Sequence, residues 1–374
     1  MANQVYRLSE ARELRGFTIM ELADKLGVSR QTIYKYESGT QNPSAEIMQK
    51  IVEVLDLPYS FFAKPYVGLQ FDDRPIFFRD MKTNLDKNRK MAKRWLHLLY
   101  DRVMEYENYL LLPKVNIPVF EISDFSELEL EEIDNIAEKV RRFWGLGDGP
   151  ISNLTLLLEN NGFIIAHKDV LSDKLDACSM IFNGRPCILV NTKRFTCSRV
   201  LMNLAHELGH IILHQGAGMS DIADASTLKL IEAQAKRFAA SFLMPPSTFS
   251  NEVGYPTISQ FILLKRRWRT SIASMALHCR SLGLINEEKK QYFLRELSRN
   301  GMLKFEPLDD ELDVESTNLL FDCERAIVEA GLELQDALLQ KSCLTQNDYC
   351  ELISAPVDYF EPIRKKPILR LINS

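Results

Sequence analysis

The feature that most constrains this chain is the run NLAHELGH at residues 203–210, which contains an H-E-x-x-H motif. Residues four apart lie on one face of a helix, so the imidazoles of His206 and His210 would reach the same metal ion. Glu207 would then be placed to take a proton from a metal-bound water. Zinc lowers the pKa of such a water to about 7, which makes hydroxide available at neutral pH. The motif therefore predicts a helix that carries a hydrolytic zinc site.

The residues around the motif have the periodicity of an amphipathic helix over 198–214. Apolar side chains recur on one face, and the opposite face carries three of the six histidines of the chain, at positions 206, 210 and 214. Catalytic zinc sites usually take three protein ligands and keep one position open. We therefore expect His214 to make a local hydrogen bond or packing contact in preference to binding the metal.

A third ligand would have to come from another element, and Glu232 is the candidate. It falls in a second predicted helix, 228–243, at the edge of the apolar stripe. A carboxylate at such an edge needs a partner, which a metal ion would supply. The alternative is a surface ion pair with Lys236, four residues further along the same helix. The spacing alone does not decide between these two roles.

A second motif lies near the N-terminus, in the run TIMELADKLG at residues 18–27. Its apolar residues, at positions 19, 22, 23 and 26, have helical spacing, and Gly27 suits the end of that helix. Ser29 is a natural N-cap for a second helix with the sequence RQTIYKYE. The pattern predicts a helix-turn-helix, although a small helical bundle with a polar outer face would share the same periodicity.

The outer face of that second helix carries side chains that suit the reading of DNA bases. Arg pairs with guanine, Gln with adenine, and Thr with either base edge or a thymine methyl group. A recognition helix offers mainly its N-terminal residues to the major groove. The residues that we expect to contact DNA are Ser29, Arg30, Gln31, Thr32 and Lys35. Residues 1–65 hold eight basic and eight acidic side chains, so their general attraction to phosphates is modest.

The run LADKLGVSRQTIYKYESGTQNPS resembles the helix-turn-helix of XRE/Cro/C1-type repressors. The resemblance covers residues 6–63 and includes the Glu-x-Gly-x-x-x-Pro ending at Glu37, Gly39 and Pro43. It implies a five-helix, lambda-repressor-like DNA-binding domain at residues 1–65. It also implies that the partner of this domain is a double-stranded DNA operator.

The central motif is similar to the ImmA/IrrE family of metallopeptidases. HELGHIILH is followed by EAQAKRFAASFLMP, which matches the family pattern H-E-x-G-H and then E-x-x-A-x-x-F-A-A-x-x-L-M-P, and the resemblance covers about residues 150–250. It implies a zincin-like fold in which His206, His210 and Glu232 bind Zn²⁺ and Glu207 is the general base, with Mn²⁺ as an alternative ion in vitro. It further implies an endopeptidase that cleaves XRE-type repressors, in a stress response or in the regulation of mobile elements or phage defence.

The distribution of charge indicates how the parts are arranged along the 374 residues. The formal net charge of −5 conceals a basic stretch at 79–102 and an acidic stretch at 121–138, separated by Pro113 and Pro118. We predict a basic helical connector at 66–120, a metallopeptidase domain at 121–285 and a helical C-terminal region of unknown role at 286–374. The connector helix would be solvent-exposed or dimer-forming, or would add phosphate contacts to the DNA-binding domain.

Three short β-rich runs lie between residues 162 and 191. Asn183-Gly184 is a strong hairpin signal, because both residues adopt the positive φ values of a two-residue turn. A small antiparallel sheet is therefore expected before the zinc helix. Together with the helical periodicities, this predicts an α+β chain that is mostly helical.

Other sequence features narrow the location of the protein. Its seven cysteines include no C-x-x-C pair, which argues against a disulfide framework or a zinc ribbon. No apolar run approaches the roughly 20 residues that cross a bilayer, and the first residues lack the apolar core of a signal peptide. We expect a cytoplasmic protein with no membrane partner.

These observations lead to three hypotheses about function. The leading one is a DNA-binding regulator, as a monomer or a homodimer, whose zinc peptidase domain cleaves an XRE-family repressor in trans or in its own chain. The second is a non-proteolytic transcription factor that uses the metallopeptidase fold to sense a ligand or partner. The third is an antitoxin-like regulator.

Overall fold

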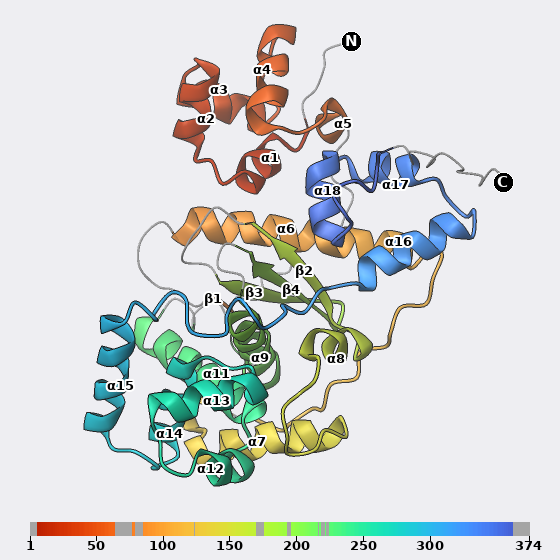
Figure 1. Cartoon of the computed structure of the whole chain (residues 1–374). Helices are drawn as coiled ribbons and strands as arrows, with labels where there is room; N and C mark the ends of the chain where they lie inside the picture. The colour runs from red at the N-terminus through yellow and green to blue at the C-terminus, as the bar shows by residue number, and fades with distance from the viewer. Residues whose placement is uncertain are drawn as a thin grey trace, which may run out of the picture.

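The computed structural model describes residues 6–63, 77–78, 85–122, 124–169, 176–192, 196–215, 217, 221 and 224–361. These residues are mostly helical and include one four-stranded sheet, in agreement with the predicted α+β class. A helical N-terminal domain lies at one end of the molecule, and helices surround the sheet in the middle (Figure 1). The C-terminal helices return to lie beside the N-terminal domain (Figure 1).

The N-terminal domain contains the five predicted helices. These are α1 Leu8–Leu14, α2 Ile19–Leu26, α3 Arg30–Glu37, α4 Ala45–Leu55 and α5 Tyr59–Phe62. A capping box starts α2, in which the hydroxyl of Thr18 and the carboxylate of Glu21 each accept the other residue's backbone N–H. Gly27 ends α2 with φ 68°, and the Ser29 hydroxyl caps α3 by accepting from the Thr32 N–H at 3.1 Å. The turn between α2 and α3 is therefore built from the residues that predicted it.

The sheet has the strand order β1-β3-β4-β2. Its strands are β1 Phe77–Phe78, β2 Ile164–Lys168, β3 Ala177–Phe182 and β4 Arg185–Asn191. Asn183 and Gly184 have φ values of 47° and 82° and make the expected tight turn, so β3 and β4 are antiparallel. β2 pairs with the other edge of β4 and is parallel to it, where antiparallel pairing was expected. The reason is topological. β2 and β3 run in opposite directions and pair with opposite edges of β4, so one of them must be parallel to β4.

Helices that follow the connector cover one face of the sheet and share one hydrophobic core with it. The predicted helices 198–214 and 228–243 correspond to α9 Cys197–Leu213 and α11 Ala225–Leu243. The elements on this side are η1 Phe125–Glu127, α7 Leu130–Phe143, α8 Leu154–Asn160, α9 Cys197–Leu213, α11 Ala225–Leu243, α12 Pro246–Val253, α13 Ile258–Trp268, α14 Ile272–Ser281 and α15 Glu287–Arg299.

The opposite face of the sheet is covered by the connector helix and by the end of the chain. The helices there are α6 Leu85–Tyr106, α16 Leu319–Glu329, α17 Gln335–Ser342 and α18 Gln346–Ile353. Their buried side chains form one core with the inward residues of the N-terminal domain and with Ile164, Ala166 and Leu189 of the sheet. The N-terminal domain thus packs on α6 and shares apolar burial with the rest of the chain.

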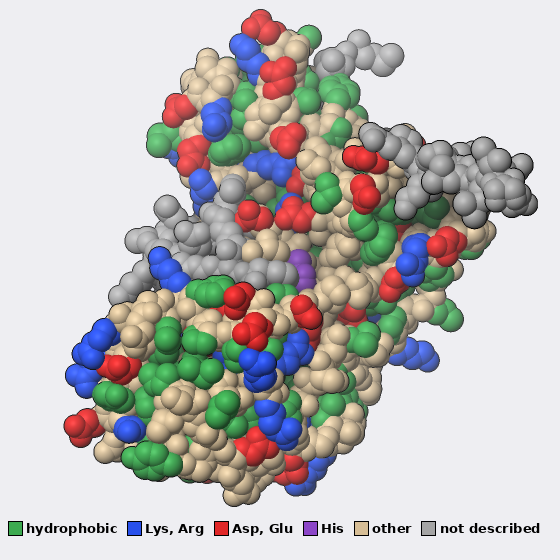
Figure 2. Space-filling model, viewed as in Figure 1, with side chains coloured by type: hydrophobic (Ala, Val, Ile, Leu, Met, Phe, Trp, Pro, Cys, Tyr) green, Lys and Arg blue, Asp and Glu red, His purple; other side chains and the backbone are tan. Residues whose placement is uncertain are grey.

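Ion pairs reinforce the junction between the N-terminal domain and the remainder. Arg15 Nη2 lies 2.5 Å from Asp348 Oδ2, and the other oxygen of Asp348 accepts from Lys168 Nζ at 2.9 Å. Arg94 Nη2 of α6 lies 2.8 Å from Glu13 Oε2. Acidic and basic side chains accordingly lie along the junction (Figure 2). The structure thereby gives the C-terminal region a contact with the N-terminal domain that the sequence did not reveal.

All seven cysteines are unpaired thiols, and six of them are buried, so the described part of the chain contains no disulfide framework. None of the helices within the described ranges is both long and apolar enough to cross a membrane.

Candidate functional site

The site is formed where α9 packs against α11, under the sheet (Figure 1). His206 and His210 lie one turn apart on α9, and Glu232 lies on α11. Gly209 allows the two helices to approach closely, because an added Cβ there would lie 3.2 Å from the Cα of Ala235. The absence of a side chain at this position therefore helps to bring the carboxylate to the two imidazoles.

The three predicted ligands converge on one point. His206 Nε2 lies 3.0 Å from His210 Nε2, and the two oxygens of Glu232 lie 3.5 Å from His206 Nε2 and 3.3 Å from His210 Nε2. All three side chains are buried. Two ligand atoms at 2.0–2.1 Å from one tetrahedral zinc ion are about 3.3 Å apart. The observed separations match the edges of such a tetrahedron.

The chemistry of this donor set also fits a metal ion. Neither carboxylate oxygen of Glu232 has a hydrogen-bond partner, although both are buried. Such a group is unfavourable unless a charge compensates for it. Two imidazoles and one carboxylate are the protein ligands of many catalytic zinc sites. Lys236 Nζ also lies 3.6 Å from Glu232 Oε2, although the Lys236 side chain is half exposed. Glu232 therefore forms the alternative ion pair and also converges on the two histidines.

The electrostatics favour the protonation states that metal ligands need. Burial lowers the pKa of His210 to about 4, which keeps this imidazole neutral near pH 7. Burial also acts to raise the pKa of Glu232, but the neighbouring imidazoles lower it by more, so the carboxyl group is ionised. A neutral imidazole and a carboxylate are the forms that bind divalent metals.

Glu207 directly follows His206 on α9 and contacts β3. Its Oε2 accepts a hydrogen bond from the Ser179 hydroxyl at 2.6 Å, and both side chains are buried. Sequence reasoning missed Ser179, because the two residues are 28 positions apart and belong to different elements. Only the packing of β3 against α9 would have indicated this contact.

His214 makes the local contacts that were expected of it. Its Nδ1 lies 3.2 Å from Nδ1 of His210, and its Nε2 lies 2.9 Å from Oε1 of Gln234. The group of converging ligand atoms does not include it. Gln234 is a second residue that the sequence did not single out, since it falls between the predicted ligand and the apolar stripe of α11.

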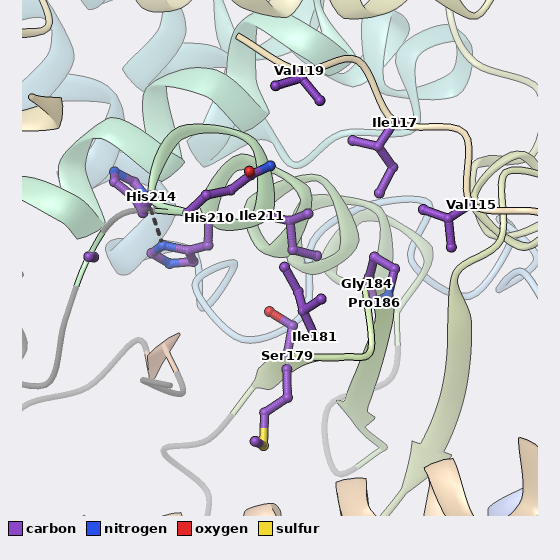
Figure 3. A pocket seen from close by; sticks show the side chains of 13 residues that line it. Val115, Ile117, Val119, Ser179, Ile181, Gly184, Pro186, His210, Ile211 and His214 are labelled. Carbon is purple, nitrogen blue, oxygen red and sulfur yellow. Dashed lines mark hydrogen bonds between the residues drawn. The ribbon is translucent and has the colours of Figure 1, made fainter. Parts of the chain in front are cut away.

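A pocket of about 340 Å³ opens beside the predicted ligands (Figure 3). His210 and His214 lie at one end, and apolar side chains of the extended segment before η1 lie at the other (Figure 3). Its apolar lining includes Val115, Ile117, Val119, Ile181 and Ile211. The pocket is therefore suited to apolar side chains of a ligand.

The predicted DNA-contacting residues lie together on α3 and at its N-terminus. Ser29, Arg30, Gln31 and Lys35 are exposed, and Thr32 is partly buried. The opposite side of α3 carries buried Ile33 and Tyr36. At the nearby start of α2, Glu21 forms an ion pair with Lys87 of α6 at 2.9 Å. The recognition face is thus open to solvent while α2 is attached to the connector helix.

Comparison with known proteins confirms both resemblances. Residues 8–62 match the family described as Helix-turn-helix, and residues 165–279 match the family described as IrrE N-terminal-like domain. The chain therefore combines a DNA-binding helix-turn-helix domain with a domain of a metallopeptidase-like family.

Individual relatives cover less of the chain. A protein of Methanococcus vannielii provisionally named as an HTH-type transcriptional regulatory protein is 29% identical over 208 residues, which are 54% of this chain and 54% of the relative. A similarly named protein of Methanocaldococcus jannaschii is 49% identical over 51 residues, which are 14% of this chain and 16% of the relative. The chain thus spans about half the length of the first relative and less of the second. A solved Mycobacterium tuberculosis transcriptional regulator matches half of each chain at 15% identity with a TM-score of 0.30.

Proposed function

Because the chain joins a helix-turn-helix domain to an IrrE N-terminal-like domain, we propose that it is a transcriptional regulator whose second domain is a zinc-dependent endopeptidase. Its substrate is an XRE-type repressor, either a separate protein or the chain itself, and cleavage relieves repression in a stress response or in the control of mobile elements. The observation that carries the proposal is the convergence of His206, His210 and Glu232, on a helix where Glu207 directly follows the first of these ligands.

The reaction that we propose is hydrolysis of a peptide bond. Zinc held by the three ligands would supply a bound water with a pKa of about 7. Glu207 would be the general base that takes a proton from the attacking water and returns it to the amine nitrogen released when the peptide C–N bond breaks. The Ser179 hydroxyl donates to Oε2 of Glu207 at 2.6 Å and so helps to orient the carboxylate.

The substrate would bind as an extended peptide along β3. Among the described residues, β1 pairs with the outer edge of β3 at Cys178 and Ser179, and we propose that the peptide pairs with the part of this edge nearer Phe182. A peptide added there would form main-chain hydrogen bonds with β3 and place apolar side chains in the adjoining pocket. The pocket therefore supports cleavage of extended, apolar segments of a repressor.

The helix-turn-helix domain would direct this activity to an operator. The exposed N-terminal residues of α3 enter the major groove, with Arg30 and Gln31 reading base edges. Helix-turn-helix proteins commonly bind two half-sites as dimers, so we propose a homodimer on DNA. Sedimentation of the protein with and without its operator tests that arrangement.

The decisive experiment compares Glu207→Gln with the matched control Glu288→Gln, which changes an exposed carboxylate of α15. Each protein is incubated with zinc or manganese and with purified XRE-type repressors, including the protein itself, and any cut is mapped by mass spectrometry. We expect Glu207→Gln to retain zinc and to lose cleavage, and the control to behave as wild type. Cleavage by Glu207→Gln would overturn the mechanism. Absence of stoichiometric zinc from wild-type protein purified without chelators would favour a non-proteolytic sensor.

A further inference from the structure

A chain of polar contacts leads from the backbone of η1 to the predicted ligand His210. Gln234 Nε2 donates to the carbonyl oxygen of Phe125 at 2.6 Å. Gln234 Oε1 lies 2.9 Å from His214 Nε2, and His214 Nδ1 lies 3.2 Å from His210 Nδ1. Both histidines and Gln234 are buried. These contacts lie outside the set of converging ligand atoms.

The direction of each hydrogen bond follows from the one before it. A carbonyl oxygen only accepts, so the amide nitrogen of Gln234 must face Phe125 and its oxygen must face His214. An amide oxygen also only accepts, so His214 must carry its proton on Nε2. A neutral His214 has no second proton, so its Nδ1 is an acceptor. His210 must then donate from Nδ1.

We infer that His214 and Gln234 are positioning residues that hold His210 in its Nδ1–H tautomer and so present its Nε2 lone pair to the metal. The inference rests on the zinc site of the proposed function and adds to it the source of the ligand's orientation. A metal-binding imidazole is commonly held in this way by a hydrogen bond from its other nitrogen. Here a neutral histidine and an amide occupy the place that a carboxylate often takes.

Packing reinforces this orientation. The ring of Phe125 meets the His214 ring edge to face, with centroids 5.6 Å apart and planes at 84°. The His210 and His214 rings lie 5.2 Å apart. The short helix η1 therefore contacts His214 through the Phe125 ring and Gln234 through the Phe125 carbonyl. The geometry of the metal site depends in this way on a segment about 80 residues before its first ligand.

The first test measures the tautomer in wild-type protein without metal. Nitrogen NMR of ¹⁵N-histidine-labelled protein distinguishes a protonated Nδ1 from a protonated Nε2, and single-histidine variants assign the signals. We expect His210 protonated on Nδ1 and His214 protonated on Nε2. The opposite tautomer for His210 would overturn the inference, whatever the activity of the protein.

The second test measures zinc affinity by competition with a chelator. The variants are His214→Leu, Gln234→Leu and the control His278→Leu, which removes an equally buried histidine whose Nε2 lies 2.9 Å from the Met244 carbonyl. We expect the Kd for zinc to rise about 10- to 100-fold in His214→Leu and by less in Gln234→Leu, and to stay at the wild-type value in the control. The effects of the first two changes should be less than additive in the double variant, because they act through one chain of hydrogen bonds.

The two proposals fail in different ways. If wild-type protein binds no zinc, the proposed function fails, while the tautomer measurement still decides the inference. If wild-type protein binds zinc and His214→Leu binds it as tightly as His278→Leu does, the positioning role is wrong and the zinc site stands.

Discussion

Asp348 of α18 joins three parts of the chain that are far apart in sequence, and we predict that its removal strongly destabilises the fold. One of its carboxylate oxygens lies 2.5 Å from Arg15 Nη2 of the N-terminal domain, and the other lies 2.9 Å from Lys168 Nζ of β2. Asp348 is 6% exposed and Lys168 is 5% exposed, so water does not replace these contacts. Asp348→Ala would therefore leave buried positive charge without its shared counterion.

The expected loss in the free energy of unfolding depends on the contacts that Arg15 and Lys168 keep in Asp348→Ala. Removing one partner of a buried ion pair typically costs about 3–5 kcal/mol. Arg15 still donates to the carbonyl oxygens of Leu55 and Asp56, and Lys168 keeps its ion pair with Glu351. These remaining contacts place the loss at the lower end, at about 3 kcal/mol of the free energy of unfolding.

The pH dependence of this contribution has a defined sign. Burial acts to raise the pKa of Asp348, but Arg15 and Lys168 lower it by more, so its folded pKa lies below the ordinary value. A carboxyl group of this kind stabilises the fold above its unfolded pKa of about 4 and loses that contribution as the pH falls through its folded value. The difference between wild type and Asp348→Ala should shrink in acid.

Urea unfolding followed by tryptophan fluorescence measures the effect. Lys168 Nζ lies 4.2 Å from the centroid of the Trp95 ring, so this indole reports on the junction. The control is Asp322→Ala, which removes an exposed pair with Arg325 on α16 and should cost less than about 1 kcal/mol. Hydrogen exchange of α1 and α18 should rise in Asp348→Ala alone. A loss no larger than that of the control would refute the assigned role of the junction.

Three further predictions concern the operator, the pH and the backbone. Gln31→Ala and Lys35→Ala should weaken binding to an operator selected from random duplexes without lowering the melting temperature, and unchanged affinity would remove the recognition-helix assignment. Burial raises the pKa of Glu159 to about 7, so its favourable contribution is present below pH 4.5 and is lost as the pH rises through 7. Wild type should therefore lose stability relative to Glu159→Gln between pH 5 and 8 in urea titrations, and a difference independent of pH would contradict this. Gly162 and Gly184 have φ values of 86° and 82°, but only at Gly162 would an added Cβ meet another backbone segment, at 2.6 Å. Alanine at position 162 should cost at least about 1 kcal/mol more than alanine at position 184, and equal losses would show that φ strain alone matters.

The sequence predicted the parts of the site that lie close together along the chain. His206 and His210 lie one helical turn apart, so their approach depends only on the formation of α9. The same holds for the turn between α2 and α3, where Gly27 and Ser29 act through their own neighbouring backbone. Local geometry and capping decide such features, whatever the rest of the chain does.

Contacts between distant segments were decided only by the tertiary structure. Spacing left Glu232 between a metal ligand and a partner of Lys236, and the packing of α11 on α9 placed it within 3.5 Å of both imidazoles. The parallel pairing of β2 with β4 and the hydrogen bond from Ser179 to Glu207 likewise depend on how strands and helices pack. The tie through Asp348 spans 333 residues. Periodicity and capping describe each element separately, whereas these contacts arise from the burial of apolar faces against one another, which depends on the whole fold.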